Sequence, residues 1–106
     1  MFNNQPTPSV SDIKKQLDNS QAIIVDVRSD SEYHAAHADG AMHLSVERIM
    51  QGEAPTEDKN KKVYLYCASG GRSSMAEKTL KQQGYDAANI GGLSDWQSAG
   101  GKVVRS

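Results

Sequence analysis

The chain contains one cysteine, Cys67, and its sequence surroundings are those of a reactive thiol. The apolar and aromatic run from Lys62 to Cys67 predicts a buried strand, and the run from Ser73 to Gln83 predicts a helix. A cysteine between these two elements lies at the carboxyl end of a strand, where open α/β sheets bind their ligands. This position favours a nucleophilic thiol.

The residues that follow the cysteine are small and can donate hydrogen bonds from the backbone. None of Ala68, Ser69, Gly70 and Gly71 is proline, so each offers an N–H group while the chain curls tightly. If these groups converge, they and the positive end of the next helix form a site for an anion, either the thiolate or an oxyanion. A buried structural thiol is the alternative, because free cysteine is among the most buried residues. The Gly-Gly-Arg sequence that follows favours the reactive thiol.

Length and composition limit the classes of function. The 106 residues suffice for one domain with a core but not for two. With 37% hydrophobic and 24% charged residues and a net charge of -1, the chain is typical of soluble globular proteins and does not favour nucleic-acid binding. No apolar run is long enough to span a bilayer, and the first residues lack the regions of a signal peptide. A lone cysteine also fits a reducing compartment, so we expect a cytoplasmic protein without a membrane partner.

The order of the predicted elements indicates the fold class. Strands alternate with helices, which predicts a parallel α/β sheet. Residues 1–8 contain Pro6 and Pro8, and we expect them to form an extended entry segment before a domain over 9–106. The other expected strands are 22–27, 41–44 and 87–90, and the other expected helices cover about 9–19, 30–37, 46–50 and 93–99. In the helix after the cysteine, the residues expected to face the core are Met75, Ala76, Thr79 and Leu80.

Asp26 interrupts an apolar strand, so its carboxylate must be paired or hydrogen-bonded. Arg28 or local backbone N–H groups are the nearest candidates, and we interpret Asp26 as architectural rather than catalytic. A metal site is also conceivable, because His34 and His37 lie three residues apart and His43 follows. No second cysteine or nearby carboxylate cluster completes a ligand set, so we expect no metal.

Several short motifs occur in a fixed order along the chain. They are Val25-Asp-Val-Arg28, Glu32-Tyr33, His37 with Gly40-Ala41, Tyr66-Cys67-Ala-Ser-Gly-Gly-Arg-Ser73, Gly84-Tyr85, and Gly91-Gly92-Leu-Ser-Asp-Trp96. Each motif is weak alone, but together, from about Ser9 to Val104, they resemble a single-domain rhodanese, a sulfurtransferase. The resemblance implies a small five-stranded parallel sheet flanked by helices on both faces.

The resemblance also implies the site residues. It places the sulfur-carrying cysteine on Cys67 and the substrate-binding loop on Ala68, Ser69, Gly70, Gly71, Arg72 and Ser73. Arg72 matches the basic residue that holds the loop or receives the anionic part of the substrate. Two features depart from the family. Ala68 replaces the arginine that follows the cysteine in many thiosulfate-using members, and Ala38-Asp39 with His43 alter a segment away from the site.

The mechanism implied by the family passes through a persulfide. Cys67 attacks the outer sulfur of a donor such as thiosulfate, expels sulfite, and passes the sulfur to cyanide or a thiol. The expected partners are therefore a small-molecule sulfur donor and a thiol or protein acceptor. No metal or organic cofactor is expected, because sulfur itself is the cargo.

Two other classes of function remain open. Related dual-specificity phosphatases share the fold and a cysteine-loop-arginine site, and a phosphatase or arsenate reductase is one alternative. Their loop has five residues between cysteine and arginine, whereas four separate Cys67 from Arg72, which favours sulfur. The other alternative is a non-catalytic or sulfur-carrier module that binds a partner, although non-catalytic modules usually lack the cysteine.

Overall fold

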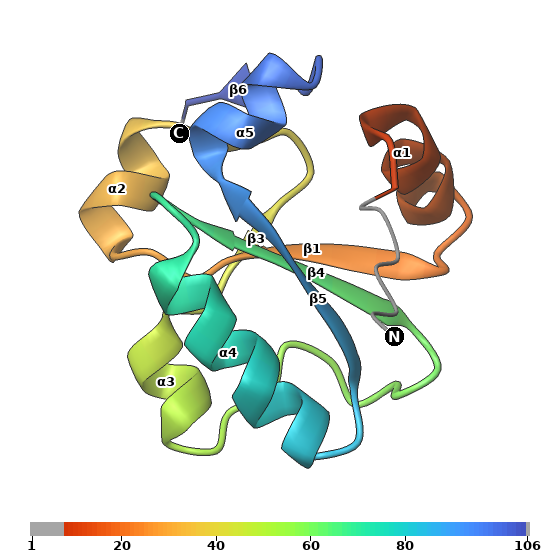
Figure 1. The fold of residues 1–106 in the computed structure, drawn as a ribbon, viewed down its shortest axis with the longest axis vertical. Coiled ribbons are helices and arrows are strands. Elements are labelled where there is room, and N and C mark those ends of the chain that lie inside the picture. The colour runs from red at the N-terminus through yellow and green to blue at the C-terminus, as the bar shows by residue number, and fades with distance from the viewer. Residues whose placement is uncertain (1–7, 106) are drawn as a thin grey trace, which may run out of the picture.

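A four-stranded parallel sheet forms the centre of the fold (Figure 1). The structure is a computed structural model that describes residues 8–105, so the expected entry segment 1–8 lies outside the described residues except for Pro8. The strands, in spatial order, are β3 (Met42–His43), β1 (Ala22–Asp26), β4 (Lys62–Cys67) and β5 (Asp86–Gly92). The pairs β3–β1, β1–β4 and β4–β5 are all parallel. The α/β class expected from the sequence is confirmed.

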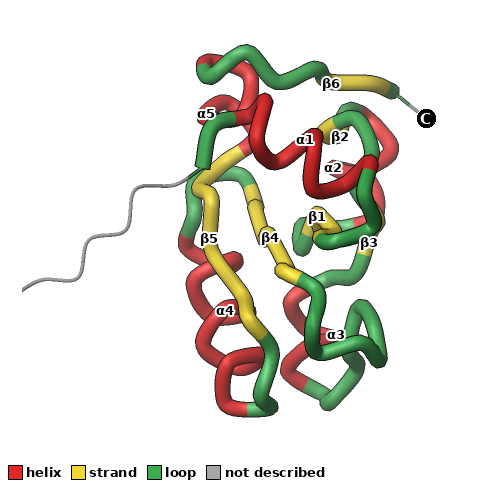
Figure 2. Tube along the Cα trace, turned by 90° about the vertical axis from the view of Figure 1, so that its right-hand side faces the viewer, coloured by secondary structure: helices red, strands yellow, loops and turns green. Residues whose placement is uncertain are grey.

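Helices cover both faces of this sheet (Figures 1 and 2). Helices α3 (Val46–Met50) and α4 (Gly71–Gln82) lie on one face, and α1 (Val10–Asp18) and α5 (Leu93–Ser98) lie on the other. Helix α2 (Asp30–Ala35) follows β1 at the carboxyl end of the sheet, where the functional residues were expected. Each face of the sheet therefore has its own hydrophobic core.

The expected five-stranded sheet is wrong in its strand count. Within residues 8–105 the parallel sheet has four strands, and two further strands, β2 (His37–Ala38) and β6 (Val103–Val104), pair with each other in an antiparallel ribbon. Strand β2 begins where a helix was expected to continue, because Ala36 takes an extended backbone conformation with φ -169° and ψ 140°. The helix expected to reach about His37 therefore ends at Ala35, and the two residues after Ala36 form β2.

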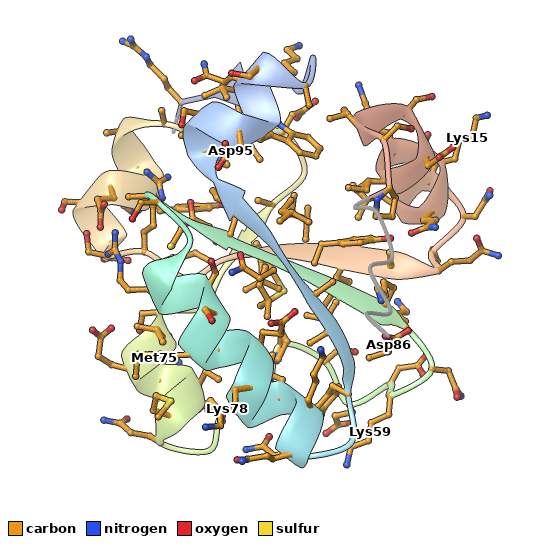
Figure 3. All side chains as sticks on the ribbon, in the orientation of Figure 1. Lys15, Lys59, Met75, Lys78, Asp86 and Asp95 are labelled. Atoms are coloured by element: carbon orange, nitrogen blue, oxygen red, sulfur yellow. The ribbon has the colours of Figure 1, made fainter. Side chains whose placement is uncertain are left out.

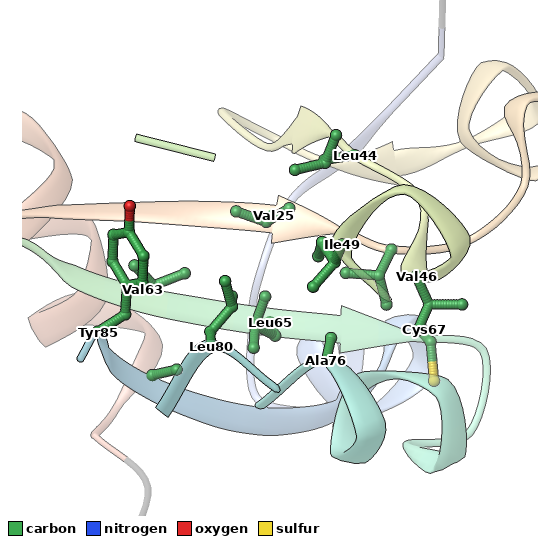
Figure 4. Packing of buried hydrophobic residues seen from close by; sticks show 12 residues of the cluster. Val25, Leu44, Val46, Ile49, Val63, Leu65, Cys67, Ala76, Leu80 and Tyr85 are labelled. Atoms are coloured by element: carbon green, nitrogen blue, oxygen red, sulfur yellow. The ribbon is translucent and has the colours of Figure 1, made fainter. Parts of the chain in front are cut away.

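Strand β4 divides its side chains between the two cores. Successive side chains of a strand point to opposite faces. Val63, Leu65 and Cys67 accordingly lie in the cluster beneath α3 and α4, shown in Figure 4. Tyr64 and Tyr66 lie in the cluster beneath α1 and α5. This alternation points the side chain of Cys67 to the face of the sheet that α4 covers.

The inward face of α4 differs from the expected one. The helix begins at Gly71 rather than Ser73, and its buried residues are Ser73, Ala76 and Leu80, at spacings of three and four. Met75, labelled in Figure 3, is 54% exposed, so its expected place in the core is wrong. Because Ser73 heads the buried stripe, the stripe continues to the loop that follows Cys67.

Asp26 belongs to a buried hydrogen-bonded cluster at the carboxyl end of β1. The carboxylate is fully buried and accepts hydrogen bonds from the backbone N–H and the guanidinium of Arg28. The hydroxyl of Tyr66 donates to the same carboxylate at 2.7 Å and accepts the backbone N–H of Ala38 at 2.9 Å. The expected pairing with Arg28 is confirmed, whereas the contribution of Tyr66 was not foreseen.

We expect the Tyr66→Phe variant to lower the free energy of unfolding by about 1–3 kcal/mol. The change removes a donor from the buried carboxylate and leaves the N–H group of Ala38 without its partner. Urea denaturation measures this loss. Tyr64→Phe is the matched control. Among residues 8–105 the Tyr64 hydroxyl bonds only to the side chain of Gln16, at 2.6 Å, so its loss should cost about 0.5–1.5 kcal/mol. Equal losses in the two variants would contradict the assigned role of Tyr66.

Candidate functional site

Cys67 is the last residue of β4, and its side chain is 1% exposed. Its side chain is directed toward the first turn of α4 (Figure 4). The thiol therefore meets the end of a helix at which backbone N–H groups have no partner within the helix. This arrangement brings hydrogen-bond donors and the positive end of the helix dipole to the sulfur.

Several donors surround the sulfur atom. The backbone N–H of Gly70 donates to Sγ at 2.9 Å, and the hydroxyl oxygen of Ser73 lies 3.4 Å from it. Burial by itself raises the pKa of the Cys67 thiol. Hydrogen bonds from the Ser73 hydroxyl and from the backbone N–H groups of Ser73, Ser69 and Gly70 outweigh burial and lower that pKa from 9.0 to about 7. The loop therefore stabilises the thiolate.

The loop depends on a glycine at the start of α4. Gly70 precedes the helix with φ 101°, a left-handed conformation that other residues rarely adopt. Gly71, Arg72 and Ser73 then form the first turn of α4 instead of the preceding loop. Ala68 and Ser69 are the exposed part of the loop. The residues expected to bind substrate therefore divide between a short loop and a helix N-terminus.

Strand β5 supports the loop from beneath. Gly92 is aligned with Cys67 across the sheet, and a Cβ atom at Gly92 would lie 2.1 Å from the carbonyl oxygen of Ala68. Only glycine permits this close approach of the loop to the strand. The strand expected over 87–90 is longer in the structure, where Gly91 and Gly92 form the end of β5. The contact between Gly92 and the cysteine loop explains why the Gly91-Gly92 motif contains a glycine at position 92.

Asn89 is a loop-supporting residue that sequence reasoning missed. Its side-chain amide donates to the carbonyl oxygen of Gly70 at 3.0 Å, and its Oδ1 atom lies 2.7 Å from the Ser73 hydroxyl. A polar residue in an apolar edge strand beside the Gly-Gly motif was the available signal. It could not be used, because the sequence does not show which face of β5 meets the loop.

Arg72 forms an ion pair with Glu32 of α2. Both terminal nitrogens of the guanidinium bind the carboxylate, at 2.8 and 3.0 Å. The hydrogen bond from Arg72 is the main reason that the pKa of Glu32 falls from 4.5 to about 2, while the pKa of Arg72 is raised. Glu32 belongs to one of the short motifs of the sequence, but its contact with the loop was not foreseen. The positive charge of Arg72 is therefore partly neutralised beside the cysteine loop.

Of the three histidines considered for metal binding, His37 and His43 take part in packing, whereas His34 is exposed. The ring of Tyr33 stacks with those of His37 and His43, at centroid distances of 3.9 and 4.9 Å. A ring nitrogen of each histidine lies at a backbone carbonyl, that of Tyr33 for His37 and that of Arg28 for His43. Over residues 8–105 no group of three or more His, Cys, Asp or Glu side chains could hold a metal ion. In the same part of the chain, no helix is both long enough and apolar enough to cross a membrane.

Comparison with known proteins relates this chain to sulfur-transferring proteins. It is 34% identical over 73 residues to the Escherichia coli thiosulfate sulfurtransferase PspE, covering 67% of this chain and 70% of PspE. It is 33% identical over 94 residues to YrkF of Bacillus subtilis, which has the name of a sulfur carrier protein, covering 86% of this chain and 50% of YrkF. A tRNA uridine(34) hydroxylase of Erwinia tasmaniensis is 28% identical, and the match covers only 23% of it. The chain thus spans half or less of the length of the last two relatives.

Solved structures and a family comparison complete this evidence. A structure described as rhodanese with anions, from E. coli, superposes with a TM-score of 0.71 at 30% identity, covering 80% of this chain and 99% of that one. A rhodanese-like domain protein from Staphylococcus aureus superposes with a TM-score of 0.70 at 31% identity, covering 91% and 94%. Residues 9–99 match the family model of the rhodanese-like domain. The chain therefore belongs to the rhodanese-like family.

Proposed function

We propose that this protein is a sulfurtransferase that carries sulfur as a persulfide on Cys67. The observation that carries the proposal is the arrangement of hydrogen-bond donors around a single thiol at the N-terminus of α4. Relatives named as thiosulfate sulfurtransferases and as a sulfur carrier support the same chemistry. We assign the domain to residues 9–106, and a reducing, cytoplasmic setting would keep its lone thiol free.

The first step is an attack on the donor. The Cys67 thiolate forms a bond to the outer sulfur of thiosulfate, while the bond between the two thiosulfate sulfurs breaks and sulfite leaves with its electron pair. The product is a persulfide with its negative charge on the terminal sulfur. Backbone N–H groups of Ser69, Gly70 and Ser73 bind the Cys67 sulfur. We expect N–H groups of this loop to stabilise the charge as it moves to the terminal sulfur.

The second step returns the enzyme to its starting state. A nucleophile, cyanide in the assay or a small-molecule or protein thiol in the cell, attacks the terminal sulfur. The bond between the two sulfurs of the persulfide breaks, and its electron pair stays on Cys67 as the thiolate. The chain then needs a donor and an acceptor, and no oxidant or reductant enters the cycle.

Arg72 would receive the anionic part of thiosulfate. Its guanidinium sits in the first turn of α4, close enough to Cys67 for the two charges to interact. The Glu32 carboxylate already occupies it, so thiosulfate would have to compete with Glu32 for the cation. This competition and the neutral side chain of Ala68 both weaken the case for thiosulfate as donor. The second candidate function is therefore a sulfur carrier between protein thiols, and the name of YrkF agrees with that function.

The short loop disfavours a phosphatase or an arsenate reductase. Only four residues separate Cys67 from Arg72, and the carbonyl oxygen of Gly70 is tied down by the amide of Asn89. A tetrahedral oxyanion over the sulfur needs a wider ring of N–H groups than this loop forms.

Incubation with thiosulfate should increase the intact mass of the protein by one sulfur atom, and cyanide should remove that mass. Both changes follow from persulfide chemistry at Cys67 and are measured by mass spectrometry under non-reducing conditions. Cys67→Ser is the control and should show neither change. Sulfur loading or turnover in this variant would place the chemistry at another residue.

The alkylation rate of Cys67 by iodoacetamide should rise with pH through a midpoint near 7. The thiolate is the reactive form, and a lowered pKa means that the thiolate is present above pH 7 and is lost as the pH falls below it. The same protein in concentrated urea is the control, since its thiol lacks the loop and should titrate near pH 8.5. Equal midpoints in the folded and unfolded protein would show that the loop does not stabilise the thiolate.

Variants of the ion pair should shift the thiosulfate KM in opposite directions. Arg72→Ala removes the cation and should lower kcat/KM by about ten- to a thousand-fold, chiefly through KM. Glu32→Gln frees the cation but keeps an acceptor for the N–H of Ser29 at the start of α2, so it should lower KM by about two- to tenfold. Steady-state kinetics with cyanide as acceptor measure both. If Glu32→Gln loses as much activity as Arg72→Ala, the pair serves to hold the loop.

A further inference from the structure

The side chain of Asn89 has a defined orientation beneath the active-site loop. Its Oδ1 atom accepts the backbone N–H of Gly91 at 2.9 Å, and its Nδ2 atom donates to the carbonyl oxygen of Gly70 at 3.0 Å. An N–H group can only donate and a carbonyl can only accept, so these two partners determine which end of the amide is the oxygen. The backbone N–H of Asn89 also binds the carboxylate of Glu77 at 2.9 Å, which holds the residue in place.

The orientation of the Asn89 amide determines which acceptor receives the hydrogen bond of the Ser73 hydroxyl. Ser73 is fully buried, and its oxygen lies 2.7 Å from Oδ1 of Asn89, which can only accept. The same oxygen lies 3.2 Å from the carbonyl of Gly70 and 3.4 Å from the sulfur of Cys67. A hydroxyl has one proton to donate, so these three acceptors compete for it. The contact with Asn89 is the shortest and takes the proton while Cys67 is a neutral thiol.

We propose that Asn89 is a positioning residue that directs the Ser73 hydroxyl proton between its own amide oxygen and the Cys67 sulfur as the sulfur changes charge. In the thiol state the proton points to Asn89, and a lone pair of the Ser73 oxygen faces the S–H group. In the thiolate state the charged sulfur is a stronger hydrogen-bond acceptor. Rotation of the Ser73 hydroxyl about its Cβ–Oγ bond then brings the proton to the sulfur. Such a bond to a charged sulfur is stronger than one between neutral groups.

Formation of the persulfide in the proposed function should turn the Ser73 hydroxyl back toward Asn89. Its negative charge lies on the terminal sulfur, one bond farther from Ser73, and the inner sulfur is neutral. The proton then returns to Asn89, so the Ser73 hydroxyl no longer donates to the Cys67 sulfur once the outer sulfur is bound. Asn89 therefore acts through Ser73 and contacts neither the sulfur nor the donor directly.

Two substitutions at Asn89 separate this role from simple support of the loop. Asn89→Ala removes the nearest acceptor, so only the Gly70 carbonyl still competes with the sulfur for the Ser73 proton. The thiolate should therefore gain part of this hydrogen bond, which should lower the midpoint of the alkylation pH profile by about half a unit. Asn89→Asp keeps an acceptor and adds a negative charge near the thiolate, so it should raise the midpoint by about one unit. If Asn89 only supported the loop, both variants would weaken the donors and raise the midpoint.

Ser73→Ala provides the matched background. In a double-mutant cycle, Asn89→Ala should no longer lower the midpoint once the hydroxyl is gone, because no proton remains to be redirected. Urea denaturation of each variant establishes that it is folded under the assay conditions. A midpoint that rises in Asn89→Ala, or an equal shift with and without Ser73, would overturn the proposal.

The proposal rests on Cys67 as the reactive thiol of the proposed function, but the two can fail separately. Alkylation by iodoacetamide needs no sulfur donor, so the pH profiles test Asn89 even if the protein does not accept thiosulfate. Mass measurement after thiosulfate treatment tests sulfur loading independently of these midpoints. Opposite midpoint shifts without any sulfur loading would therefore support the role of Asn89 and contradict the sulfurtransferase assignment.

Discussion

A buried sulfur can hold a negative charge only where hydrogen-bond donors replace the water that it has lost. Cys67 is 1% exposed, and burial alone opposes its ionisation. The Gly70 N–H, the Ser73 hydroxyl and the start of α4 supply the replacement. The side-chain alternation of β4 satisfies this constraint, because it directs Cys67 to the face of the sheet that α4 covers.

The donors remain aligned because a second strand supports the loop. Gly92 allows the carbonyl of Ala68 to approach β5, and Asn89 binds both the Gly70 carbonyl and the Ser73 hydroxyl. These contacts come from a segment about twenty residues farther along the chain. They show why the motif near residue 91 belongs with the cysteine motif, although it contributes no group that touches the sulfur.

Two arginine-carboxylate pairs have different settings in this fold. Arg28 and Asp26 are both buried and share their hydrogen bonds with Tyr66, so the pair joins β1 to its neighbours and is shielded from solvent. Arg72 and Glu32 are about one-third exposed and join the cysteine loop to α2. A solvent-exposed pair costs less to separate than a buried one. Of the two arginines, Arg72 is therefore the one whose carboxylate partner is more easily replaced by another anion.

Sequence patterns alone were enough to predict the fold class, the place of the lone thiol at the end of a strand and the small residues of its loop. Those features depend on local patterns: an apolar run ending in Cys67, a glycine that permits φ 101° at position 70, and alternation of strands with helices. The residues from distant parts of the chain that contact the cysteine loop became visible only in the three-dimensional structure. The contacts of Glu32 with Arg72 and of Asn89 with Ser73 join residues 40 and 16 positions apart, and local periodicity has no information on such pairs. The antiparallel ribbon was not foreseen for the same reason, since its strands His37–Ala38 and Val103–Val104 lie far apart in the sequence.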